Sequence, residues 1–165
     1  MIQAQVQAKY QVPEFRIIDK TPALSVIIDQ LACAGTVVQT VDKYVYLKIS
    51  DEFITKLFPL IQNGENQKPD YFSGSNKSGA HISIIFPEEH SGALEPEDDG
   101  KVLYFSVKDL FKTKILGKTY FAIEVTSTGL EGLRNKYGLI KDKINFRGVF
   151  VPFHITIGVA RVEPS

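Results

Sequence analysis

The feature that most constrains the fold is a four-residue pattern that occurs twice: histidine, apolar residue, hydroxyl residue, apolar residue. It reads His-Ile-Ser-Ile at residues 81–84 and His-Ile-Thr-Ile at residues 154–157. Each copy closes the same predicted order of elements, which is a strand, a helix, a loop and the strand that carries the histidine. Internal similarity of this kind indicates a duplicated unit. The chain is therefore expected to contain two pseudo-equivalent halves.

Hydrophobic periodicity predicts the elements of each repeat. In the first repeat these are a strand at residues 44–50, a helix at 51–62 that Pro59 kinks or shortens, and a strand at 80–86. In the second repeat they are a strand at 119–126, a helix at 128–137 and strand-like sequence at 146–160. Outside the repeats, the sequence predicts a helix from Thr21 to Gly35 and strands at 37–41 and 102–107.

This order of elements in a chain of 165 residues predicts an α+β fold built round one core. We expect a single bilobal domain over residues 1–165, with one lobe centred on 37–99 and the other on 102–160. The two pseudosymmetric lobes are each expected to be an antiparallel sheet with helices outside. The two sheets are then expected to face a central cleft.

The histidine strands would bring polar groups to that cleft. Side chains alternate between the two faces of a strand, so His81 and Ser83 share one face of theirs. His154 and Thr156 share a face in the same way. If the halves pack about a pseudo-twofold axis, the two polar faces meet, and two imidazoles and two hydroxyls surround one space.

A cleft with two histidines suits phosphoryl transfer without a metal. A neutral imidazole can accept a proton from the attacking water or hydroxyl, and a protonated imidazole opposite can donate one to the leaving oxygen. The hydroxyls of Ser83 and Thr156 can hydrogen-bond the non-bridging phosphate oxygens. The sequence leaves open which histidine is the acid and which is the base.

The two motifs, in this order of elements, resemble those of the two-histidine (2H) phosphoesterase superfamily, and the resemblance extends over residues 44–159. It implies a bilobal fold in which His81 and His154 form the acid/base pair. It also implies that Ser83 and Thr156 bind phosphate, with no metal and no other cofactor. The implied activity is that of a phosphodiesterase acting on a cyclic phosphate or a 2′-linked phosphodiester of a nucleotide or RNA end.

Fixed positive charge near the motifs would assist phosphate binding. Lys77 precedes the first motif and Arg147 precedes the second, and both are candidate phosphate-binding residues. Residues 128–165 contain six lysines and arginines against three acidic residues, which favours an anion-facing second lobe.

The segment at residues 87–99 carries six carboxylates and no lysine or arginine. We expect a solvent-exposed loop there. A metal site formed by these carboxylates and His90 is a weaker alternative, because their spacing matches no known pattern of metal ligands.

Aromatic residues close to the motifs could stack on a nucleobase at the rim of the cleft. The candidates are Tyr71, Phe72 and Phe150. Phe153 adjoins His154 and should point to the opposite face of the strand, so it is expected to pack in the core.

Charge balance and cysteine content limit the expected binding partners and the expected cellular compartment. Nineteen lysines and arginines offset nineteen acidic residues, so no overall field attracts long nucleic acid or an anionic membrane. The expected partner is a nucleotide or RNA-end substrate, with no membrane contact and no obligate protein partner. Cys33 is the single cysteine, and no apolar run is long enough for a signal peptide or a bilayer span. These features predict a cytoplasmic protein.

Two other functions are compatible with the same sequence. The first is a non-catalytic nucleotide- or phosphate-binding or regulatory module, in which the histidines only hold a phosphate. The second is an interaction domain with structural histidines and no ligand. Replacement of either histidine separates the first alternative from an enzyme, since it would abolish turnover in an enzyme but only weaken affinity in a binding module.

Overall fold

The computed structural model describes residues 15–17, 25, 29–61, 67–69, 78–90 and 92–161. The strands are β1 (Phe15–Ile17), β2 (Ala34–Gln39), β3 (Val45–Lys48), β4 (His81–Ile85), β5 (Val102–Tyr104), β6 (Ser106–Ile115), β7 (Lys118–Thr126), β8 (Ile144–Phe146), β9 (Val149–Val151) and β10 (His154–Arg161). The helices are α3 (Glu52–Thr55), α4 (Phe58–Ile61) and α5 (Thr128–Lys136). In the described residues, no helix has the length and hydropathy needed to span a bilayer.

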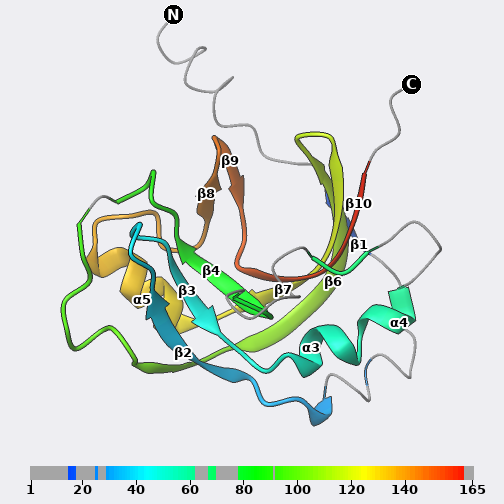
Figure 1. Cartoon of the computed structure of the whole chain (residues 1–165), viewed down its shortest axis with the longest axis horizontal. Helices are drawn as coiled ribbons and strands as arrows, with labels where there is room; N and C mark the ends of the chain where they lie inside the picture. The colour runs from blue at the N-terminus through cyan, green and yellow to red at the C-terminus, as the bar shows by residue number, and fades with distance from the viewer. Residues whose placement is uncertain are drawn as a thin grey trace, which may run out of the picture.

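The histidine strands lie side by side at the centre of a large sheet. Its eight strands follow the order β1-β6-β7-β10-β4-β3-β2-β5. This order is symmetric about the β10–β4 pair, because β7 and β3 flank the pair, β6 and β2 come next, and β1 and β5 form the edges. The two repeats therefore occupy equivalent places on either side of the centre. Figure 1 shows that the sheet is curled and that the β8–β9 hairpin rises beside it.

The structure confirms the antiparallel sheet and the repeated order of elements, but it does not confirm two separate lobes. Strand β10 pairs with β4 through Ile155 and Ile82, which joins both halves into one sheet. Adjacent strands twist relative to one another, so a single sheet can curl far enough to form a concave face. One curled sheet therefore takes the place of the two facing sheets that the sequence predicts (Figure 1).

The helices of each repeat pack against the histidine strand of the other repeat. Helices α3 and α4 belong to the first repeat and contact β10 of the second, whereas α5 of the second repeat contacts β4 and β5. The isoleucines of the two motifs are completely buried, and alternation along the strands places them on the face opposite the histidines. Each repeat therefore supports the histidine strand of the other.

Helix α5 forms where the sequence predicts it, because both of its ends carry suitable residues. The hydroxyl of Ser127 accepts a hydrogen bond from Leu130 N at 3.1 Å, which caps the first turn. Gly138 follows the last turn with φ 75°, a conformation that glycine adopts without strain. The other predicted helix of the repeats, at residues 51–62, is divided into α3 and α4, and Pro59 lies in the first turn of α4.

The helix predicted from Thr21 to Gly35 ends too late. Ala34 and Gly35 begin strand β2, and residues 21–24 and 26–28 of the predicted helix lie outside the described residues. A Cβ atom on Gly35 would lie only 2.4 Å from the carbonyl oxygen of Lys48 on the neighbouring strand. This glycine is therefore required by the close approach of two strands and does not mark the end of a helix.

Strand β6 is much longer than predicted. The sequence analysis ended a strand at residue 107, whereas β6 continues to Ile115. Leu116 and Gly117 then turn the chain into β7 with φ 52° and 80°, as expected for a two-residue hairpin turn. Buried Phe111, Thr113 and Ile115 alternate with more exposed lysines, which is typical of a strand with one buried face.

Candidate functional site

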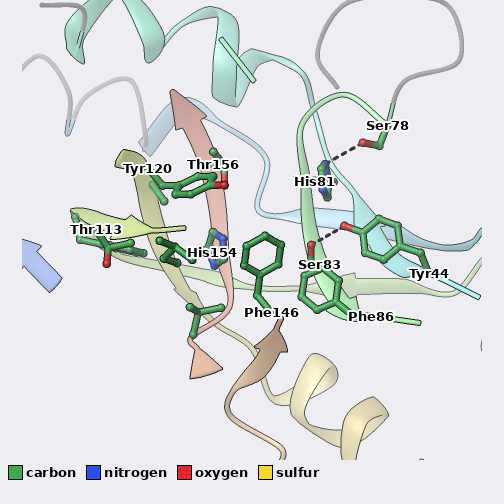
Figure 2. A pocket seen from close by; sticks show the side chains of 14 residues that line it. Tyr44, Ser78, His81, Ser83, Phe86, Thr113, Tyr120, Phe146, His154 and Thr156 are labelled. Carbon is green, nitrogen blue, oxygen red and sulfur yellow. Dashed lines mark hydrogen bonds between the residues drawn. The ribbon is translucent and has the colours of Figure 1, made fainter. Parts of the chain in front are cut away.

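A cavity of about 330 Å³ lies beside the two histidine strands. It is lined by Tyr44, Ser78, His81, Ser83, Phe86, Phe111, Thr113, Ile115, Tyr120, Ala122, Phe146, Val151, His154 and Thr156. All four polar residues of the two motifs are in this set, and Figure 2 shows them facing the same space. The structure therefore brings together the histidines and hydroxyls that the sequence analysis selected.

The pairing of β4 with β10 sets how these four residues are arranged. Ile82 lies opposite Ile155 in an antiparallel pair, so the preceding residue of one strand lies next to the following residue of the other. His81 is thus opposite Thr156 in register, and Ser83 is opposite His154. Each imidazole has one hydroxyl along its own strand and a second hydroxyl across the pair.

The same hydrogen bond holds both histidine rings. Nδ1 of His81 lies 2.7 Å from the carbonyl oxygen of Gly79, and Nδ1 of His154 lies 2.8 Å from that of Pro152. A carbonyl oxygen can only accept, so Nδ1 carries the hydrogen in both rings. In the neutral rings, Nε2 is then the nitrogen with a lone pair, and it is the atom able to take up a proton.

The turn before His81 is built to present the Gly79 carbonyl. Gly79 has φ 65°, and a Cβ atom there would lie 2.5 Å from Oδ1 of Asp51. That carboxylate oxygen accepts from the backbone N–H of Ala80 at 2.9 Å and from Nζ of Lys48 at 2.8 Å. The glycine before the first motif therefore lets helix α3, strand β3 and the histidine strand meet closely.

Tyr44 contacts the first hydroxyl of the site. Its Oη lies 2.5 Å from Oγ of Ser83 (Figure 2). Burial raises the pKa of Tyr44 above its ordinary value, so the phenol is protonated at neutral pH. If the phenol donates to Ser83, the serine hydroxyl keeps its own hydrogen for an acceptor in the cavity. The sequence analysis did not select Tyr44, which precedes strand β3 by one residue.

Arg147 lies near the cavity but does not line it. It is exposed at the turn of the β8–β9 hairpin, where its φ is 52°. Its guanidinium carbon lies 5.4 Å from the ring centroid of Phe146, a lining residue. Burial raises the pKa of Tyr120, another lining residue, and the positive charge of Arg147 opposes that rise. The arginine is therefore close to two residues of the cavity wall.

Aromatic rings form much of the wall, but they are not the rings that the sequence analysis selected. Phe86, Phe111 and Phe146 line the cavity, whereas Phe150 does not. Tyr71 and Phe72 lie outside the described residues. Phe153 is buried in the core, as predicted.

A family model described as 2H-SAK, the Swiss Army Knife 2H phosphoesterase domain, matches residues 45–164. The chain belongs to the 2H phosphoesterase superfamily. The match includes both histidine motifs, which confirms the resemblance seen in the sequence. No curated protein and no solved structure matches the chain significantly. Membership of the 2H phosphoesterases indicates phosphoester hydrolysis.

Both motif histidines of this 2H phosphoesterase are neutral at pH 7. Burial lowers the pKa of His81 to about 4; the hydrogen bond to Gly79 opposes this, and the charges of His154 and Lys48 add to it. Burial also lowers the pKa of His154, against the opposing effects of Pro152 and Glu124. A negative charge bound between the rings would raise both pKa values.

The acidic segment of this 2H phosphoesterase is largely the exposed loop that the sequence predicts, since Glu88, Glu95, Glu97 and Asp99 are exposed, but its other two carboxylates are buried. The Glu89 side chain is 5% exposed and pairs at 2.8 Å with Arg134, which is 1% exposed. Asp98 is also buried, accepts from Oη of Tyr137 at 2.6 Å and lies 2.8 Å from Nζ of Lys136. Helix α5 supplies these partners. Arg134 is therefore not part of an anion-facing surface, as its inclusion in the charge count had suggested.

The remaining candidate residues are Lys77 and the possible metal ligands near His90. Lys77, the other candidate cation, lies outside the described residues. Within the described part of the chain, no group of three or more His, Cys, Asp and Glu side chains is arranged to hold a metal ion. His90, the third histidine, packs against Tyr137 with ring centroids 5.2 Å apart and does not line the cavity.

Proposed function

We propose that this protein is a metal-independent phosphodiesterase that acts on a cyclic phosphate or a 2′-linked phosphodiester of a nucleotide or an RNA end. The matched orientation of His81 and His154 carries the proposal. Both rings donate Nδ1–H to a carbonyl two residues earlier, and both line one cavity. Two structural histidines would not need the same tautomer and the same space.

In the proposed reaction, water attacks the phosphorus atom of the substrate. One neutral histidine accepts a proton from this water through Nε2 as the new P–O bond forms. The other histidine, in its protonated form, donates a proton to the oxygen of the P–O bond that breaks. A cyclic phosphate is thereby opened to a phosphomonoester, and proton exchange with water returns the histidines to their starting forms.

Substrate binding supplies the protonated histidine. Both rings are neutral in the free protein because burial disfavours the imidazolium. A phosphodiester brings one negative charge into the cavity, which favours protonation of the nearest imidazole. That proton then lowers the pKa of the second ring, so one ring is charged while the other stays neutral.

The remaining polar groups bind the phosphate in the proposed complex. Ser83 and Thr156 donate hydrogen bonds to the two non-bridging oxygens, which hold the phosphorus between the histidines. Arg147 adds positive charge from the hairpin turn when its side chain turns toward the cavity. Lys77 is proposed as a second phosphate-binding cation from its place before the first motif.

The shape and chemistry of the cavity support a nucleotide as the substrate. Its volume of about 330 Å³ is within the range of roughly 300–1,000 Å³ that is typical of sites for small molecules. Phe86, Phe146 and Phe111 offer faces and edges on which a base can stack. A nucleotide, or the last nucleotide of an RNA end, fits such a wall better than a long polyanion.

The decisive experiment measures hydrolysis of the four nucleoside 2′,3′-cyclic monophosphates and a 2′,5′-linked dinucleotide in the presence of EDTA. Wild-type protein is compared with the His81→Ala and His154→Ala variants. His90→Ala is the matched control, because this histidine lies outside the cavity. We expect turnover in EDTA by wild type and the control, and a loss of at least about 100-fold in each of the other variants.

Other outcomes would contradict the proposal in different ways. Loss of activity in EDTA that returns with added metal would contradict the metal-independent mechanism. Binding of the cyclic nucleotides without turnover would favour a nucleotide-binding or regulatory module on the same fold. Equal activity of His81→Ala and His90→Ala would show that the first motif histidine is not catalytic.

A further inference from the structure

The Phe86 and Phe146 rings form one side of the cavity but come from different parts of the chain. Phe86 follows strand β4, and Phe146 ends strand β8 of the small hairpin. Their ring centroids are 5.5 Å apart, and the Phe86 ring stacks on Tyr44 at 5.6 Å with an interplanar angle of 9°. Figure 2 shows the Phe146 ring between Ser83 and His154, with the Phe86 ring next to it below Ser83. A base that stacks here depends on the spacing of these rings.

One buried carboxylate connects the two backbone segments that carry these rings. Oε1 of Glu89 accepts from the backbone N–H of Phe86 at 3.0 Å. Oε2 of the same residue accepts from the backbone N–H of Asn145 at 3.1 Å. Asn145 directly precedes Phe146, so each oxygen of Glu89 holds the chain beside one of the two rings.

Arg134 fixes the carboxylate from the side of helix α5. Its two terminal nitrogens donate to Oε1 and Oε2 of Glu89 at 2.9 and 2.8 Å. The same guanidinium donates to the carbonyl oxygens of Ile84 at 2.8 Å and Ile140 at 2.6 Å. Planar paired contacts of this kind fix the orientation of a carboxylate as well as its position.

The hairpin is not part of the large sheet, and it is held to the rest of the molecule by the buried side chains of Ile144 and Val151 and by the hydrogen bond of Asn145 to Glu89. Strands β8 and β9 form a separate two-stranded sheet among the described residues. A two-stranded hairpin is only marginally stable by itself. The hydrogen bond from Asn145 to Glu89 is thus a direct attachment of the hairpin to the segment that follows the first histidine strand.

We propose that Glu89 is a positioning residue that sets the spacing of the Phe86 and Phe146 rings and thereby the affinity for the base of the substrate. This role rests on the proposed phosphodiesterase function. Glu89 acts through the two backbone segments and does not contact the phosphate. Its effect is therefore on substrate binding through the base, while the histidines and hydroxyls on β4 and β10 keep their arrangement.

The test compares Glu89→Gln with wild type on two substrates. Adenosine 2′,3′-cyclic monophosphate carries a base, whereas glycerol 1,2-cyclic phosphate has the same reacting group without one. We expect the variant to raise KM for the adenosine substrate by roughly tenfold, with kcat within about twofold, because stacking contributes to binding of the base. The kcat/KM for the glycerol substrate should stay within about twofold.

Amide hydrogen exchange gives a measurement that does not depend on turnover. The N–H groups of Phe86 and Asn145 should exchange faster in Glu89→Gln, because a neutral amide holds two backbone donors and a guanidinium less well. Lys136→Ala is the matched control. Lys136 lies on the same helix and pairs with Glu95, Glu97 and Asp98 outside the cavity, so exchange at both amides and both KM values should be unchanged.

A second variant covers the case in which Glu89→Gln does not fold. The double variant Glu89→Leu with Arg134→Met replaces the buried pair by apolar side chains, which proteins tolerate better than one unpaired charge. It leaves the Phe86 and Asn145 amides without the carboxylate, so the same rise in KM for the adenosine substrate is expected.

Different results would overturn the phosphodiesterase function and the role of Glu89. Absence of turnover by wild type on both substrates, in folded protein, would overturn the phosphodiesterase function. If wild type is active, an unchanged KM for the adenosine substrate in both folded variants would overturn the role of Glu89. Equal losses of kcat/KM on the two substrates would also overturn it, since they would indicate general damage to the site.

Discussion

Ile82 of β4 lies directly opposite Ile155 of β10, at the centre of the eight-stranded sheet. This one pair determines which groups meet in the cavity. His81 comes to lie beside Thr156 and Ser83 beside His154, so imidazole and hydroxyl alternate on both strands and across them. A shift of either strand by one residue would turn its histidine to the opposite face of the sheet. The buried isoleucines and the polar cavity therefore specify the same register.

The two hydroxyls of this arrangement are expected to contribute to catalysis separately. Ser83→Ala and Thr156→Val each remove one donor to the phosphate and keep the side chain close to its original size. We expect each variant to lower kcat/KM for cyclic nucleotides by about 100-fold, the usual effect of removing one such donor. Thr126→Val, at the exposed end of β7, should keep wild-type kinetics. A loss below about threefold in both site variants would contradict a phosphate-binding role.

Tyr44 and Ser83 are expected to act as one hydrogen-bonded unit. Tyr44→Phe removes the group that lies 2.5 Å from the serine hydroxyl and should lower kcat/KM several-fold. In the double variant with Ser83→Ala, the effect of Tyr44→Phe should largely disappear, because its partner is already absent. A double-mutant cycle should therefore give a coupling of about 1 kcal/mol in transition-state stabilisation. Additive effects would show that the tyrosine acts independently of the serine.

The histidine motifs predict the two strands at the centre of the sheet, but not that these two strands pair with each other. Their shared pattern identified β4 and β10, and the strand and helix before each motif were also found. Strand periodicity then placed His81 and His154 with their hydroxyls on one face, and the structure brings these residues round one cavity. Local sequence carries this information because the period of a strand is fixed by its backbone.

The rest of the cavity depends on contacts that local sequence does not record. Glu89 is one of six acidic residues in a short segment, and its buried contacts are with Arg134, 45 residues away, and with the backbone of Asn145. Phe146 reaches the cavity because the β8–β9 hairpin is attached beside β4. Phe111, Thr113 and Ile115 are wall residues with a local signal, because they alternate with lysines and are less exposed than them in β6.

Anion binding is expected to be coupled to proton uptake. Burial holds both motif histidines neutral in the free protein, with the pKa of His81 lowered to about 4. A bound anion raises these pKa values, so affinity increases as the pH falls through the interval between the free and bound values. Calorimetric titration with sulfate in two buffers of different ionisation enthalpy should show net proton uptake near pH 6. Uptake that is unchanged in a His81→Gln, His154→Gln double variant would contradict this assignment.

Stability is expected to fall in mildly acidic solution for the same reason. The pKa of His81 in the folded protein is about 4, below the ordinary value of about 6.5 in the unfolded chain. The unfolded state therefore binds more protons between these values, and the free energy of unfolding decreases as the pH falls from about 6.5 toward 4. The contribution of this group is at most roughly 3 kcal/mol. Urea unfolding at several pH values should show a shallower decrease for His81→Gln than for wild type, and identical slopes would contradict the burial of this ring.

Two glycines offer a matched test of how tightly the sheet beneath the site is packed. An alanine Cβ at Gly35 would lie 2.4 Å from the carbonyl oxygen of Lys48 and 2.8 Å from a side-chain carbon of Leu47. Strand β2 cannot move away without weakening its pairing with β3, and β3 cannot move without disturbing its pairing with β4, so Gly35→Ala should lower the free energy of unfolding by about 2 kcal/mol or more. A Cβ at Gly132 meets no atom within 4 Å, and this residue lies inside helix α5, where alanine is preferred. Gly132→Ala should therefore raise the free energy of unfolding by about 0.5–1 kcal/mol. Chemical unfolding of both variants measures the two effects, and a neutral Gly35→Ala would mean that β2 can move away from β3 without cost to the histidine strand.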